Sequence, residues 1–151
     1  MTGKNVGAGV SAPEDTLGLT GLVPFEVVRV EPVSLRLAAG TLRLHVELPS
    51  GRSLQSGKAI HYQIHGFEAG VYVARGGQII AVRDAGFPLE IAYGPREFPE
   101  PPPRGQLLAS VAFWHTDGTR VMGQDVQWRV PIVWDPRGGN SLELRFTLAT
   151  R

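Results

Sequence analysis

The stretch that decides the fold reads LLASVAFW at residues 107–114, HTDG at residues 115–118 and VQWRVPIVW at residues 126–134. Apolar residues alternate along both longer segments, and this period of two is typical of strands with one buried face. The Asp117-Gly118 pair between them supplies the positive backbone dihedrals that tight hairpin turns need. The sequence therefore predicts a β-hairpin, with a core stripe along its second strand and a partly exposed Trp114 near its turn.

Further segments with a period of two lie on both sides of this hairpin. The clearest is TLRLHVEL at residues 41–48, where the four inward-facing residues are Leu42, Leu44, Val46 and Leu48. One apolar and one polar face is typical of an antiparallel sheet packed on a core. We therefore predict an all-β chain, folded as an immunoglobulin-like antiparallel β-sandwich. The other predicted strands cover residues 25–31, 60–65, 71–74, 78–82, 87–93 and 141–148, with a Gly-Gly hairpin at Gly76-Gly77.

Two stretches lack the strand pattern. Residues 1–22 are rich in Gly, Ser and Thr and have no sustained period, so we predict a flexible N-terminal arm before a β-sandwich domain over residues 23–151. Residues 95–103 contain five prolines. Because proline donates no backbone hydrogen bond and favours extended neighbours, this stretch is predicted to be an extended loop.

The composition excludes several functional classes. The 151 residues are 42% hydrophobic and 19% charged, which is ordinary for one globular domain. A net charge of +1 gives no summed field for nucleic acid, and no apolar run approaches the roughly 18 residues of a membrane helix. We therefore predict neither a nucleic-acid partner nor membrane insertion. Residues 1–13 contain no hydrophobic block of a secretory signal. The absence of cysteine excludes disulfides and thiolate chemistry, and it leaves the cellular compartment undecided.

No catalytic constellation can be recognised in the chain. There is no Gly-x-Ser-x-Gly elbow between a strand and a helix, and no Gly-rich phosphate loop before a helix. We therefore predict that the protein is not an enzyme and that it carries no cofactor.

The four histidines are the candidate metal ligands besides the carboxylates. His61 and His65 share the polar face of one predicted strand, but four strand residues span about 13 Å, too far for one ion. A copper or zinc site would need His45, His115 or a carboxylate from a neighbouring strand, with Met122 as a soft ligand. We favour the other interpretation, in which these side chains bind a partner and no metal. The predicted binding surface consists of His45, His61, Gln63, His65, Trp114 and His115.

Several segments also resemble a known module. They are VSLRL at residues 33–37, GTLRLHVELP at residues 40–49, and the hairpin segments VAFWH at residues 111–115 and VQWRVPI at residues 126–132. Together they resemble the C-terminal β-sandwich of thioredoxin-like proteins that carry NHL repeats, which is similar to the immunoglobulin-like N-terminal domain of disulfide-interchange proteins. The resemblance implies a sandwich with two cysteines near the hairpin. Here neither cysteine is present, so the redox role does not carry over.

Two functions remain open for the chain. The first is a non-catalytic interaction or accessory module that docks on a protein partner or on another domain of its parent protein, by strand addition or side-chain contact. The alternative is a carrier domain that binds a metal through His and Met, or a small ligand.

Overall fold

The computed structural model describes residues 23–67, 70–96 and 104–149. Strands make up most of these residues, which contain no α-helix. The predicted all-β sandwich is confirmed. The predicted arm over residues 1–22 and most of the proline-rich loop lie outside the described residues. In the described part of the chain, no helix is long and apolar enough to cross a membrane.

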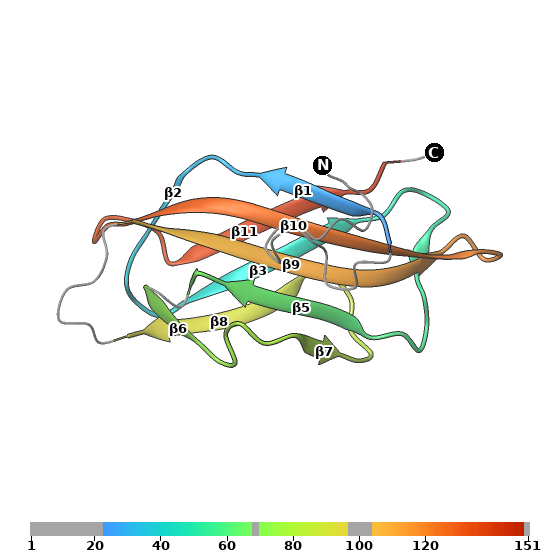
Figure 1. The fold of residues 1–151 in the computed structure, drawn as a ribbon, viewed down its shortest axis with the longest axis horizontal. Helices are drawn as coiled ribbons and strands as arrows, with labels where there is room; N and C mark the ends of the chain where they lie inside the picture. Colours follow the sequence, from blue (N-terminus) through green and yellow to red (C-terminus); the bar gives the residue numbers. More distant parts are fainter. Residues whose placement is uncertain (1–22, 68–69, 97–103, 150–151) are drawn as a thin grey trace, which may run out of the picture.

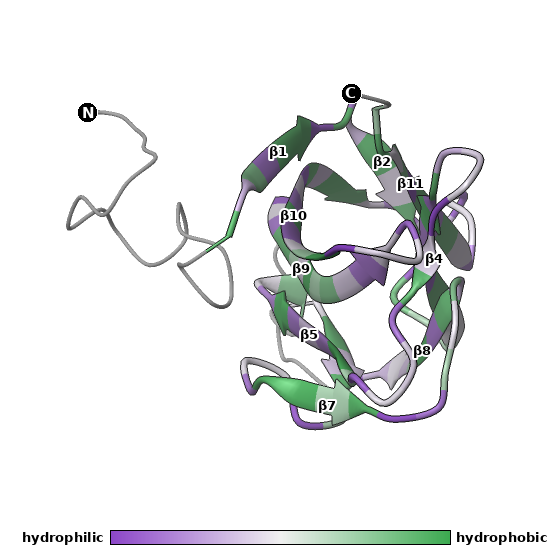
Figure 2. Cartoon of the chain, turned by 90° about the vertical axis from the view of Figure 1, so that its right-hand side faces the viewer, coloured by the Kyte–Doolittle hydropathy of each residue, from purple (hydrophilic) through white to green (hydrophobic). Residues whose placement is uncertain are grey.

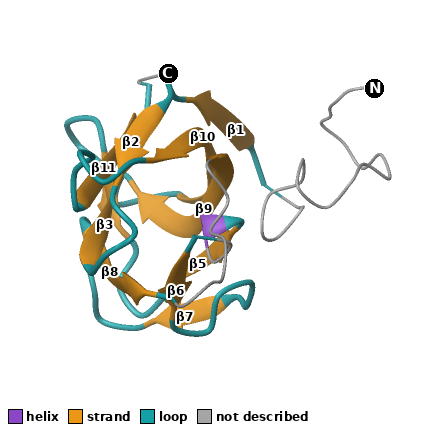
Figure 3. Ribbon diagram, turned by 90° about the vertical axis from the view of Figure 1, so that its left-hand side faces the viewer, coloured by secondary structure: helices purple, strands orange, loops and turns teal. Residues whose placement is uncertain are grey.

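Two sheets pack face to face (Figure 1). In the described chain the first sheet has seven strands. Five of them follow the order β1 (Phe25–Arg29), β10 (Val121–Trp134), β9 (Arg104–Thr116), β5 (Ile60–His65) and β7 (Ile80–Val82). The other two are short: β2 (Val33–Leu35) also pairs with β10, and β4 (Ser53–Leu54) also pairs with β9. The second sheet has four, ordered β11 (Ser141–Thr147), β3 (Gly40–Glu47), β8 (Leu89–Pro95) and β6 (Val71–Val73). In end views the two sheets curve around one interior (Figures 2 and 3).

The predicted hairpin is confirmed as β9 and β10, and its strands are longer than the alternation indicates. Thr116 still pairs with Val121, so the turn occupies residues 117–120. The Asp117 carboxylate accepts backbone hydrogen bonds from Arg120 at 2.8 Å and Thr119 at 2.9 Å. These bonds, together with one from the Thr119 hydroxyl, hold the pKa of Asp117 well below its usual range. Gly118 takes the positive φ, at 100°. The Asp-Gly pair thus acts through both residues, one by its carboxylate and the other by its backbone freedom.

Both sheets are mixed, whereas the sequence predicts wholly antiparallel sheets. Strands β1 and β2 run parallel to β10, and β11 runs parallel to β3. An alternating pattern specifies which side chains face the core, but it is the same for a parallel and an antiparallel neighbour. The direction of these strands therefore depends on the connections between distant parts of the chain.

The predicted Gly-Gly hairpin is wrong. Strand β6 pairs with β8 in the second sheet, while β7 pairs with β5 in the first. Gly76 and Gly77 thus lie where the chain crosses from one sheet to the other, and Gly77 adopts a φ of 83°. Gln63 Nε2 donates a hydrogen bond to the Gly77 carbonyl at 3.0 Å, which fixes this crossing against β5.

The predicted core stripes are confirmed. Leu42 and Leu44 of β3 are fully buried, and they face the stripe of β10 that includes Trp128. Trp128 Nε1 donates a hydrogen bond to the Arg145 carbonyl of β11 at 3.0 Å, so this side chain links the two sheets. The buried members of the predicted stripes are Leu42, Leu44, Val126, Trp128, Val130, Ile132, Trp134, Leu142 and Leu144, while Val46, Leu48 and Phe146 are partly buried against them.

Candidate functional site

The six residues of the predicted binding surface do not form one surface. His61, Gln63 and His65 lie on β5 in the first sheet, where they alternate with the buried Ile60 and Ile64 and so face outward. His45 lies on β3 in the second sheet, beside the buried Leu44. Because the sheets pack face to face, their outward faces point in opposite directions. The sequence prediction of one face bearing His45 and His61 is therefore wrong: alternation assigns a residue to a face of its strand but not to a sheet.

His45 takes part in a small charged network on the second sheet. Its Nε2 atom lies 2.9 Å from Glu143 Oε1 on the adjacent β11, and Arg145 donates to the same oxygen at 3.1 Å. A shared carboxylate of this kind is a common feature of exposed sheet faces and contributes little to stability. His45 is thus engaged within its own sheet.

Trp114 and His115, neighbours on β9, point to opposite sides of the first sheet. Trp114 is half-buried as predicted, with Lys58 Nζ 5.8 Å from the ring centre. His115 is only 3% exposed, so its assignment to an exposed surface is wrong. The period of two explains this result, because His115 shares the inward face with the buried Phe113.

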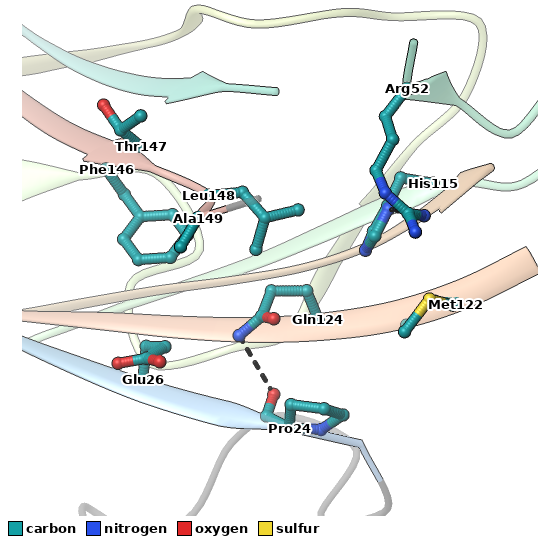
Figure 4. A pocket seen from close by; sticks show the side chains of 11 residues that line it. Pro24, Glu26, Arg52, His115, Met122, Gln124, Phe146, Thr147, Leu148 and Ala149 are labelled. Carbon is teal, nitrogen blue, oxygen red and sulfur yellow. Dashed lines mark hydrogen bonds between the residues drawn. The ribbon is translucent and has the colours of Figure 1, made fainter. Parts of the chain in front are cut away.

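His115 opens onto a cleft at one end of the sandwich, with a volume of about 360 Å³ (Figure 4). The cleft lies where the hairpin end meets β1, the segment before β4, and the end of β11. In Figure 4, Arg52 and His115 lie on one side and Phe146 and Leu148 on the other. The residues that determine its chemistry are Glu26, Arg52, His115, Met122, Gln124 and Phe146.

The contact between Arg52 and His115 determines which ring nitrogen of the neutral imidazole carries the proton, and it affects the pKa of the ring. Arg52 Nη1 lies 3.3 Å from His115 Nδ1. A guanidinium group only donates hydrogen bonds, so Nδ1 must be the acceptor and the neutral ring carries its proton on Nε2. Burial lowers the pKa of His115, and the positive charge of Arg52 lowers it further.

The lowered pKa of His115 predicts how the free energy of unfolding depends on pH. Below pH about 6.5 the unfolded chain takes up a proton at His115 that the folded chain does not. We therefore expect the contribution of His115 to the free energy of unfolding to decrease as the pH falls through 6.5 and to level off below the folded-state pKa. An NMR titration of the ring should give a pKa below 6.5, and Arg52→Gln should raise it only partly, because burial remains. A pKa at or above 6.5 would contradict the assigned environment.

Gln124 is the second buried polar side chain of the cleft. Its Nε2 atom donates to the Pro24 carbonyl at 3.2 Å and to the Asp125 carbonyl at 2.9 Å. Both amide protons are thereby used, and Oε1 is left as an acceptor. The sequence patterns did not identify Gln124 or Arg52. Gln124 interrupts the apolar stripe of β10, and this interruption is the one sequence signal that could have identified it as a site residue. Arg52 precedes β4, a strand of two residues that is too short to show a pattern.

The alternative of a metal-binding carrier finds little support in this arrangement. Among the described residues, no group of three or more His, Asp or Glu side chains is placed to hold an ion. Met122 lies directly opposite His115 across the hairpin, which places one thioether beside one imidazole. The Arg52 guanidinium occupies the Nδ1 side of that imidazole, and its charge opposes a second cation.

No protein-family model matches the chain, and no curated protein matches it. The resemblance to the β-sandwich of NHL-repeat proteins therefore stays a prediction.

Proposed function

We propose that this domain is a non-catalytic interaction module that docks an extended segment of a partner protein along one side of the sandwich. We call this the β6–β7 side and define it by residues 71–73 and 79–82, which form the edges of the two sheets on the lower side of the molecule in Figures 1 and 3. An extended segment could add to either edge by backbone hydrogen bonds, and side chains beside the edges would select it.

The observation that carries this proposal is the contrast between the two sides of the sandwich. Residues 71–73 and 79–82 contain no charged side chain, and Tyr72 and Ile79 are 60% and 51% exposed. The opposite edges, β1 and β11, carry Glu26, Arg29, Glu143 and Arg145. Charged residues on an edge strand oppose pairing with another chain, whereas an uncharged apolar edge favours it.

The outward face of β5 extends the β6–β7 side onto the first sheet. His61 lies opposite Ala81 of β7 in the register, and Gln63 and His65 follow along the same face. Imidazole and amide groups lose less solvation on burial than a lysine ammonium does. These three residues, which the sequence predicted as contacts, are thus well placed to touch the side chains of an added strand.

The test uses two variants with the same change of charge. We expect Ile79→Lys to abolish capture of the partner, because it places a charge at the uncharged edge. Val121→Lys at the hairpin end is the matched control, since Val121 has a similar exposure of 48%. Each immobilised chain is incubated with lysate of the source organism, and bound proteins are cross-linked and identified by mass spectrometry.

The proposal requires a protein that binds to the unmodified chain and to the Val121→Lys variant but does not bind to the Ile79→Lys variant. Direct binding by the purified partner should then follow the same order. Recovery of the same proteins by all three chains, or of none above the empty matrix, would contradict it. Urea unfolding of both variants checks that the fold is intact.

A further inference from the structure

The cleft at the end of the sandwich contains a guanidinium group, Arg52, that no carboxylate of the described residues contacts at ion-pair distance, although its charge also acts on the nearby Asp117 carboxylate. The hydrogen bond of Arg52 goes to a neutral imidazole. Glu26 also borders the cleft, but it forms no ion pair there with a residue of the described chain. A half-buried guanidinium with free donors is a common partner of bound anions, because its planar fork matches a carboxylate.

A second polar side chain, His115, lines the same space. His115 Nδ1 accepts from Arg52, so the neutral ring presents Nε2–H, and Nε2 has no hydrogen-bond partner in the described part of the chain. Because only 3% of the residue is exposed, this donor is held in a fixed direction. Gln124 Oε1 remains as an acceptor, because both of its amide protons are engaged.

One wall of the cleft is apolar. Phe146 and Leu148 at the end of β11 lie across from the Arg52–His115 pair, and the Met122 thioether lies beside it (Figure 4). A volume of about 360 Å³ is within the range of small-molecule sites. A few fixed polar groups beside an apolar wall select an organic molecule with one polar end.

We propose that this cleft binds a small organic carboxylate, whose charged group accepts hydrogen bonds from Arg52 and whose apolar body lies against Phe146 and Leu148. The apolar wall favours an organic body over inorganic phosphate. The site lies away from the β6–β7 side, so it is a separate function and can be tested independently.

The test compares two probes of the same shape. Sodium 3-phenylpropionate is titrated into the full chain by calorimetry and by NMR, and 3-phenylpropionamide is its uncharged counterpart. We expect saturable binding of the carboxylate, shifts of the His115 ring signals, and an affinity for the amide that is weaker by about tenfold or more. This comparison uses the unmodified protein and does not depend on how any variant folds.

Two variants then test the assigned residues. Arg52→Gln should weaken binding of 3-phenylpropionate about tenfold or more, whereas Arg137→Gln, in an exposed turn outside the cleft, should leave it unchanged. The proposal is overturned if the carboxylate does not bind saturably up to about 10 mM. It is also overturned if the amide binds equally well, or if a correctly folded Arg52→Gln retains full affinity.

Discussion

Replacing Trp128 by alanine is expected to lower the free energy of unfolding by about 3–5 kcal/mol, the range for a large aromatic removed from a core. Trp128 is fully buried between the sheets, and its indole N–H donates to the Arg145 carbonyl of the opposite sheet. The substitution therefore removes apolar contact on both sides, leaves a cavity and deletes a hydrogen bond between the sheets. Urea unfolding followed by circular dichroism measures the loss, with an unchanged m-value as the sign of an intact native state.

The variant Trp128→Phe separates the two contributions. It keeps most of the aromatic volume but cannot donate to Arg145, so we expect it to cost about 1–3 kcal/mol. This smaller change also remains measurable if the alanine variant does not fold. A cost for Trp128→Ala below about 1 kcal/mol would mean that the side chain is not central to the core.

The second large effect is expected at Leu44, where replacement by alanine should lower the free energy of unfolding by about 2–5 kcal/mol. Leu44 is fully buried on β3. The adjacent Arg43 points to the other face, where it pairs with Glu90 at 2.8 Å on the surface. Arg43→Ala is therefore expected to leave the unfolding midpoint almost unchanged, because exposed ion pairs contribute little.

The two substitutions together test the register of β3. A slip of one residue would move every side chain of the strand to the opposite face. Equal losses for Leu44→Ala and Arg43→Ala, measured by the same urea titration, would therefore contradict the register.

The parts of the fold that the sequence predicts are those that depend on local pattern. Alternation identifies the buried face of Leu42 and Leu44 and the stripe around Trp128, because burial of one strand face requires a period of two. The Asp117-Gly118 pair identifies the main hairpin, because both residues act within the turn itself. These signals need no information about which strand lies beside which.

The parts that the sequence does not predict depend on neighbours. The parallel direction of β11 beside β3, and the crossing at Gly76-Gly77, result from how distant strands fit together. The histidines show the same limit. His45 and His61 have the right polar face of their strands but belong to different sheets, and His115 lies inward. The cleft is assembled from β1, β9, β10, β11 and the segment before β4, so no local pattern could indicate that Arg52 and Gln124 lie in it.

The parallel edges of the sandwich have a consequence for how the chain is made. The hydrogen bonds of Gln124 to Pro24 and of Thr147 to Glu47 each join residues 100 positions apart. During synthesis, β1 and β3 leave the ribosome long before their parallel partners β10 and β11, so neither sheet can be completed until the last third of the chain has emerged. Contacts between such distant residues slow folding. The apolar face of β3 therefore stays open to wrong partners throughout translation, and nascent chains of this domain are expected to need protection by chaperones.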